Sequence, residues 1–117
     1  MTETLTATEA AKRARADIKT AAKNGELEAH PAGVTFSVRR EYASQMSEIN
    51  VTIKGAPEDW ALIRLDDACG PRALPSASVR LLAHALRGIV ARHYQADGCH
   101  RFISIDLQHG EDIYNVL

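Results

Sequence analysis

Arginine and tyrosine, two residue types that often anchor protein–protein interfaces, occur close together near the middle of this sequence. Arg39, Arg40 and Tyr42 lie within four positions, and Met46 adds an apolar side chain shortly afterwards. These residue types at this spacing favour a surface that captures another macromolecule. The predicted partner-binding residues are Ser37, Arg39, Arg40, Tyr42, Met46 and Asn50. An ordinary solvated hairpin end is the alternative interpretation of the same residues.

A second group of charged residues has the chemistry to contact phosphate groups. Four cations recur at helical spacing and therefore share one side of a predicted helix: Lys12, Arg15, Lys19 and Lys23. Such a face neutralises phosphates in some proteins, but Lys and Arg also favour helix formation and solvate a surface helix. The formal net charge of −1 and the aromatic content of 5% are not typical of a dedicated nucleic-acid-binding domain. Nucleic-acid binding through this face is the second hypothesis.

Metal binding or thiol chemistry needs several Cys or His side chains close together in space. The spacing of these residues along the sequence does not favour such a cluster. The best metal-ligating candidates are Cys69, Cys99, His100 and His109. The sequence has no C-x-x-C pair, and adjacent residues such as Cys99 and His100 point in opposite directions on a strand. It also has no Gly-rich phosphate loop, nucleophile elbow or paired-His zinc motif. We therefore predict no metal, no cofactor and no enzymatic activity, with a thiol- or metal-dependent enzyme as a third hypothesis.

The predicted partner-binding residues belong to a β-hairpin. Apolar and polar side chains alternate in residues 34–38 and again in residues 49–53, which places each apolar trio on one face of a strand. Residues 43–47 would form the tip. We expect the opposite face to be wetted by solvent, with these side chains on it: Thr35, Ser37, Arg39, Asn50, Thr52 and Lys54.

Two helices are predicted, one before and one after the hairpin. The first covers about residues 6–24, because Thr6 and Glu9 form a capping box and Asn24-Gly25 is a left-handed stop. Its apolar stripe is almost entirely alanine, which requires close packing on a flat surface: Ala7, Ala10, Ala11, Ala14, Ile18 and Ala21. The second covers roughly residues 77–95 after a cap at Ser76 or Ser78. Its apolar side comprises Val79, Leu82, Ala83, Leu86, Ile89 and Val90.

The remaining segments complete the expected order of elements. Residues 57–69 favour a short helix, although residues 60–65 also fit a strand, and residues 70–76 are predicted to be a loop. Residues 101–107 alternate as a third strand does, and the apolar C-terminal residues are expected to dock on the body of the protein.

The resulting order α-β-β-(α)-α-β predicts an α+β fold. We expect a two-layer sandwich, with a small antiparallel sheet and the helices on one of its faces. A length of 117 residues with 45% apolar content indicates one domain, residues 1–117. The predicted core comprises Phe36, Val38, Val51, Ile53, Leu82, Leu86 and Ile105, with Ile18 nearby.

The overall composition of the sequence also bears on the cellular location and the oligomeric state of the protein. No stretch approaches the roughly 18 apolar residues of a membrane helix, and the N-terminus lacks the pattern of a signal peptide. We therefore expect a cytoplasmic protein with reduced cysteines, no membrane contact, and a monomeric or homodimeric state.

Residues 11–24, 33–44 and 47–57 carry a resemblance to a known family. The matching positions are Gly33, Val34, Phe36, Ser37, Val38, Arg39, Tyr42, Ile49, Val51, Gly55 and Pro57. Over about residues 10–57 the chain resembles a large polyvalent protein-associated domain of phages and conjugative elements. It departs from that pattern in a longer linker before the first strand and in residues 54–57, where the family usually has an aromatic residue.

The resemblance implies an accessory role for a mobile element inside a host, in a family that is not known for enzymatic activity. The leading hypothesis is therefore a non-enzymatic protein-binding module of a phage or mobile element. Its expected partner is a host protein or ribonucleoprotein complex, such as a CRISPR effector, which it would inhibit or redirect in the manner of an anti-CRISPR protein.

Overall fold

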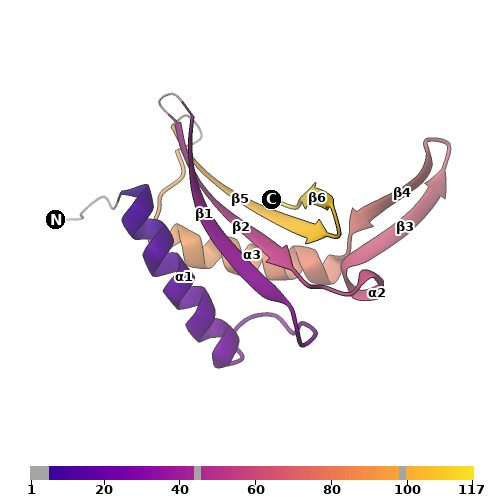
Figure 1. Cartoon of the computed structure of the whole chain (residues 1–117), viewed down its shortest axis with the longest axis horizontal. Helices are drawn as coiled ribbons and strands as arrows, with labels where there is room; N and C mark the ends of the chain where they lie inside the picture. Colours follow the sequence, from indigo (N-terminus) through magenta and orange to yellow (C-terminus); the bar gives the residue numbers. More distant parts are fainter. Residues whose placement is uncertain (1–5, 44–45, 98–99) are drawn as a thin grey trace.

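The structure is a computed structural model that describes residues 6–43, 46–97 and 100–117. Each helix is followed by two strands along the chain, as Figure 1 shows. Their order is α1 (Ala7–Lys23), β1 (Thr35–Ala43), β2 (Met46–Lys54), α2 (Glu58–Ala61), β3 (Leu62–Asp67), β4 (Gly70–Pro75), α3 (Ala77–Ala91), β5 (Arg101–His109) and β6 (Asp112–Asn115).

Four of the strands form the main sheet, in the order β1-β2-β5-β6. β1 and β2 are an antiparallel hairpin with Val38 opposite Val51, and β5 and β6 are also antiparallel. β2 and β5 run parallel, with Val51 opposite Ile105. The α+β class is confirmed, but the sheet is mixed rather than wholly antiparallel. Parallel strands need a long crossover connection, which the segment containing α3 provides.

Helix α1 covers the β1 side of the sheet, as its alanine stripe predicts. The Thr6 hydroxyl accepts a hydrogen bond from the Glu9 backbone N–H, so the predicted cap is confirmed. All six residues of the predicted stripe are buried. Because these side chains are small, α1 lies close enough to the sheet for the Arg15 guanidinium to donate to the Val38 carbonyl, at 2.8 Å.

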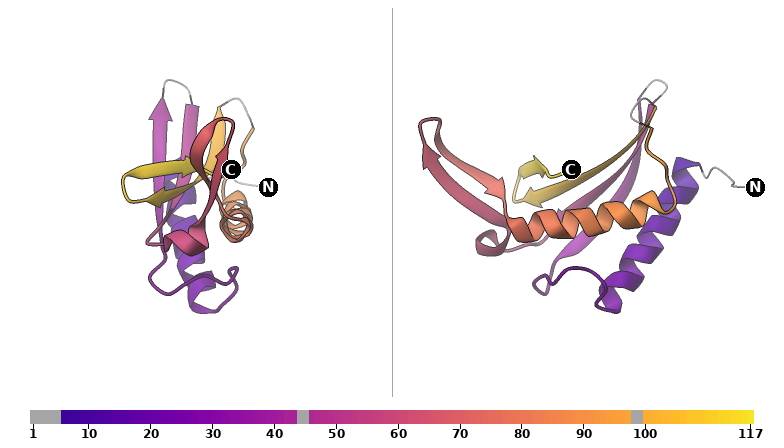
Figure 2. Two further views of the ribbon diagram at one scale, coloured as in Figure 1. Left: turned by 90° about the vertical axis from the view of Figure 1, so that its right-hand side faces the viewer. Right: turned by 180° about the vertical axis from the view of Figure 1, so that it is seen from behind.

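Helix α3 lies on the same face of the sheet as α1 (Figure 2). The Ser76 hydroxyl caps it by accepting from the Val79 N–H, and its six predicted apolar residues are buried. The helix ends at Ala91, four residues before the predicted end.

Two residues that follow α3 connect it to other elements. His93 Nε2 lies 2.6 Å from Asp17 Oδ2 and ties α3 to α1. The buried Tyr94 hydroxyl donates to the Ser47 carbonyl at the start of β2.

The core lies between the two helices and one face of the sheet. Seven of the eight residues predicted for it are buried, and Phe36 is half-buried at its margin. The C-terminus docks as expected, because Val116 and Leu117 exchange backbone hydrogen bonds with Ile105. None of the helices in the described ranges has the length and apolar character required to cross a membrane.

The segment between the hairpin and α3 differs most from expectation. Residues 57–69 contain both a four-residue helix and the strand β3. Residues 70–76, predicted to be a loop, contain the strand β4, which pairs with β3 in a separate two-stranded sheet. We call this two-stranded sheet the arm. The prediction of a loop was wrong because Gly70, Pro71 and Pro75 are tolerated in an edge strand.

We predict that Leu86→Ala lowers the free energy of unfolding by about 2–5 kcal/mol, because it leaves a cavity at a fully buried site. Leu81→Ala is the matched control, since Leu81 is on the same helix but 56% exposed. Urea titrations of both variants measure the difference. Equal losses in the two variants would contradict this assignment of the helix face.

Candidate binding site

The face of the main sheet that points away from α1 and α3 is polar. Residues that lie opposite one another on paired strands point to the same face, so Ser37, Arg39 and Glu41 of β1 share this face with their partners on β2. Those partners are Thr52, Asn50 and Glu48. Across β2, the strand β5 adds Phe102, Ser104 and Asp106. We call this surface the open face.

A hydrogen-bond network occupies the centre of the open face. The Asn50 side-chain amide donates to Ser104 Oγ and to Asp106 Oδ2, each at 2.8 Å. The Thr52 hydroxyl donates to Asn50 Oδ1. The network continues outward, because Asn115 donates to Asp106 and Ser104 donates to Glu48. Throughout the described part of the chain, no buried side-chain N or O atom lacks a hydrogen-bond partner.

This network corrects the expectation that the centre of the polar face is wetted by solvent. Asn50 is only 4% exposed and Thr52 only 2% exposed, because β2 lies between β1 and β5 and their side chains flank it. Buried polar groups that are fully hydrogen-bonded make the structure around them more rigid. Asn50 therefore positions the neighbouring strands.

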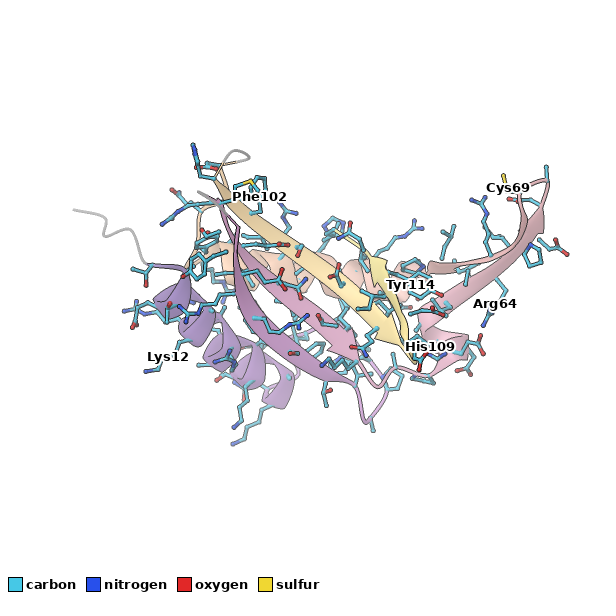
Figure 3. All side chains as sticks on the ribbon, turned by 45° about the horizontal axis from the view of Figure 1, so that its top comes forward. Lys12, Arg64, Cys69, Phe102, His109 and Tyr114 are labelled. Carbon is cyan, nitrogen blue, oxygen red and sulfur yellow. The ribbon has the colours of Figure 1, made fainter. Side chains whose placement is uncertain are left out.

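At one end of the open face the strands enclose a small hollow of about 130 Å³. Its apolar side chains on the open face are Met46 and Phe102, and Figure 3 shows Phe102 at this end of the sheet. Tyr42 borders the hollow from the helix side of β1. Its polar side chains are the two carboxylates Glu41 and Glu48. Ser47 also borders it, but its hydroxyl is hydrogen-bonded to the Tyr94 hydroxyl on the helix side. Tyr42 and Met46 are 59% and 43% exposed, so two large side chains present apolar surface to solvent here. We call this hollow the hairpin-end pocket.

The two carboxylates of the hairpin-end pocket lie on adjacent strands. Glu41 is directly opposite Glu48 in the β1–β2 register, and like charges placed opposite one another destabilise a strand pair. Among the described residues, no Lys, Arg or His lies within salt-bridge distance of either one. The pocket therefore combines apolar walls with two carboxylates that form no ion pair with the described residues, which suits a long cationic side chain.

Arg40 and Tyr42 are oriented differently from Arg39. Arg40 is opposite Ile49 and so points to the helix side of the sheet, where its guanidinium donates to the Thr8 hydroxyl of α1 and to the Tyr42 hydroxyl. Hydrogen bonds with Thr8 and Arg40 lower the pKa of Tyr42 from its ordinary 10.0. Arg40 thus ties the end of β1 to the first turn of α1.

The six predicted partner-binding residues are therefore divided between the two faces. Ser37, Arg39, Asn50 and Met46 belong to the open face, and Arg40 and Tyr42 belong to the helix side, with Tyr42 and Met46 both bordering the hairpin-end pocket. The sequence analysis did not select Glu41, Glu48 or Phe102. For Glu41 and Glu48 a signal was present, because the same alternation that places Asn50 on the open face places both carboxylates there.

The basic side of α1 is partly used within the fold. Lys12, Lys19 and Lys23 are exposed, and Figure 3 shows Lys12 on the outer side of the helix. Arg15 is exposed too, but its guanidinium is bound to the Val38 carbonyl. Three of the four cations predicted to contact phosphates thus have exposed side chains on α1.

The candidate metal ligands do not come together in the part of the chain that is described, where no group of three His, Cys, Asp or Glu residues is arranged to hold a metal ion. Cys69 is exposed at the tip of the arm, away from His109 at the end of β5 (Figure 3). Cys99 lies outside the described residues.

A wider hollow of about 760 Å³ lies between the C-terminal end of α3 and the start of β5. Its charged lining residues are Arg87, Asp97 and Arg101, and the Arg101 guanidinium lies 4.8 Å from the centre of the Tyr94 ring. Its described lining contains no Ser, Cys or His side chain to act as a nucleophile or base.

Comparison of the chain with protein-family models, curated proteins and solved structures finds no match. The resemblance to the large polyvalent protein-associated domains therefore stays a prediction from residues 10–57. The geometry of the open face and its hairpin-end pocket is the basis for the functional argument.

We predict that Asn50→Ala destabilises the fold by about 1–3 kcal/mol, because Thr52 and Asp106 then lose a buried hydrogen-bond partner. Ser37→Ala is the matched control on the same face, where the described structure shows no hydrogen bond from the Ser37 side chain. Thermal unfolding of both variants measures the effect. An Asn50 variant as stable as the Ser37 variant would contradict the positioning role.

Proposed function

We propose that this protein is a non-enzymatic binding module that captures a host protein through the hairpin-end pocket. The observation that supports this proposal is the combination of an apolar hollow, lined by Met46 and Phe102, with the carboxylates of Glu41 and Glu48, which form no ion pair with the described residues. The hollow of about 130 Å³ is below the range of about 300–1,000 Å³ that small-molecule sites occupy. It is suited to one side chain of a macromolecular partner.

The chemistry of the pocket specifies the kind of side chain that fits it. Lys and Arg have long apolar stems and a charged end, so the stem contacts the apolar walls while the charge meets the two carboxylates. A cation between Glu41 and Glu48 also removes the repulsion across the strand pair. Exposed Tyr42 and Met46 extend the contact surface around the pocket, and aromatic and Met side chains are enriched at interfaces.

A partner that presents Lys or Arg is a protein with a basic surface, of the kind that contacts nucleic acid. With the resemblance to accessory domains of phages and conjugative elements, this leads to a host nucleic-acid-binding protein or ribonucleoprotein as the partner, for example a CRISPR effector. Occupation of its basic surface would compete with the nucleic acid and so inhibit or redirect the complex.

The test is capture from a host lysate by the tagged protein, before and after nuclease treatment. We predict that Glu41→Lys reduces capture about tenfold or more, since it places a cation where the partner's cation binds. The fold is expected to remain stable, because the introduced lysine would face Glu48 across the strands as a favourable pair. Met46→Ala is expected to weaken capture without a change in melting temperature.

The control is the double charge reversal Lys12→Glu/Lys19→Glu on α1, which leaves the hairpin-end pocket intact. Capture that survives nuclease, persists in this control and is lost in Glu41→Lys supports the proposal. Loss of capture in the α1 variant, or on nuclease treatment, would instead favour the second hypothesis of nucleic-acid binding.

A further inference from the structure

The arm extends from the body of the protein (Figures 1 and 2), and beyond its buried base at Leu62 and Pro75 its residues are exposed or half-buried. Its strands β3 and β4 pair only with each other in the described structure. Hydrogen bonds at its base hold it in place, from the Ser76 N–H to the Ala61 carbonyl and from the Ser76 hydroxyl to the Trp60 carbonyl. A two-stranded sheet alone in water is only marginally stable, so the arm gains stability if a further strand pairs with it.

The two outer edges of the arm are not equivalent. β4 contains Pro71 and Pro75, which lack a backbone N–H and protect an edge from further pairing. β3 contains no proline between Leu62 and Asp67, so its edge retains a full set of donors and acceptors. An additional strand can therefore pair with the arm through β3.

The side chains of β3 select an identical strand as its partner. In an antiparallel pair with a two-fold axis at Leu65, each Leu65 faces the other copy of Leu65. The same register places each Arg64 opposite Asp66 of the second copy, so two cross-strand pairs of opposite charge form. A shift of the axis to Arg64 or to Asp66 would place like charges opposite one another. Charge complementarity thus specifies both the partner and the register.

The existing contacts of β3 do not prevent this pairing. Arg64 forms an ion pair with Glu58 within the chain, but both side chains are largely exposed, and exposed ion pairs contribute little to stability. Ile63, Leu65 and Leu74 share one face of the arm, and Ile63 is 43% exposed. Pairing through β3 brings the two apolar strips together across the axis.

We propose that two copies of this chain associate through the outer edge of β3 and form a continuous four-stranded sheet in the order β4-β3-β3-β4. The interaction surface is the β3 edge from Ile63 to Asp67, and the partner is a second copy of the chain. This assembly is independent of the hairpin-end pocket, which lies at a different part of the fold.

The test is the molar mass of the full chain in solution, measured by sedimentation equilibrium from micromolar to millimolar concentration. The wild type is expected to show a monomer–dimer equilibrium. Arg64→Asp is expected to weaken dimerisation at least tenfold, because the new Asp faces Asp66 of the other copy. The double variant Arg64→Asp/Asp66→Arg is expected to restore it, since the opposite charges have only exchanged places.

Arg80→Asp on the exposed side of α3 is the control for the change in net charge, and it is expected to leave the dimer intact. A monomer at every concentration would overturn the proposal. A dimer that resists Arg64→Asp, or that the exchanged double variant does not restore, would also overturn it, because the interface would then lie elsewhere or have another register.

Discussion

The position of β2 at the centre of the main sheet is the constraint on which the rest of the structure depends. One face of this strand buries Ile49, Val51 and Ile53 against the helices, and the other buries Asn50 and Thr52. Burial of polar side chains is costly unless they are hydrogen-bonded, and here Ser104 and Asp106 of β5 supply partners for Asn50. The central strand is thus held by apolar packing on one face and by a specific polar network on the other.

The polar network also determines what the hairpin-end pocket can do. It fixes β5 beside β2, which places Phe102 next to Glu48, while the hairpin register places Glu41 across from Glu48. Side chains held by strands are positioned more accurately than side chains on loops. The repulsion between the two carboxylates is therefore not relieved by a shift of the strands, and it persists as an attraction for cations.

Local patterns in the sequence were sufficient to predict the helices, their caps and most of the core, because periodicity and capping depend on residues near one another in the chain. The partner of β2 was not predictable in this way, since the Asn50–Ser104 contact joins residues 54 positions apart. The burial of Asn50 follows from that pairing. Arg40 was chosen by its residue type, although the alternation of the strand already places it on the same face as Val38, and the structure confirms that orientation. The hairpin-end pocket could be recognised only from the fold, because β5 brings Phe102 beside Glu48.

The parallel pairing of β2 with β5 has a consequence for synthesis of the chain on the ribosome. Until β5 has left the exit tunnel, the β1–β2 hairpin has an unpaired edge, and Ile49, Val51 and Ile53 lack much of their cover. The core can close only after β5 has emerged, because β5 follows both β2 and α3 in the sequence. Pairing between distant segments is slow and leaves intermediates prone to aggregation. The interval before β5 emerges and pairs with β2 is therefore the one in which the nascent chain is most exposed to aggregation.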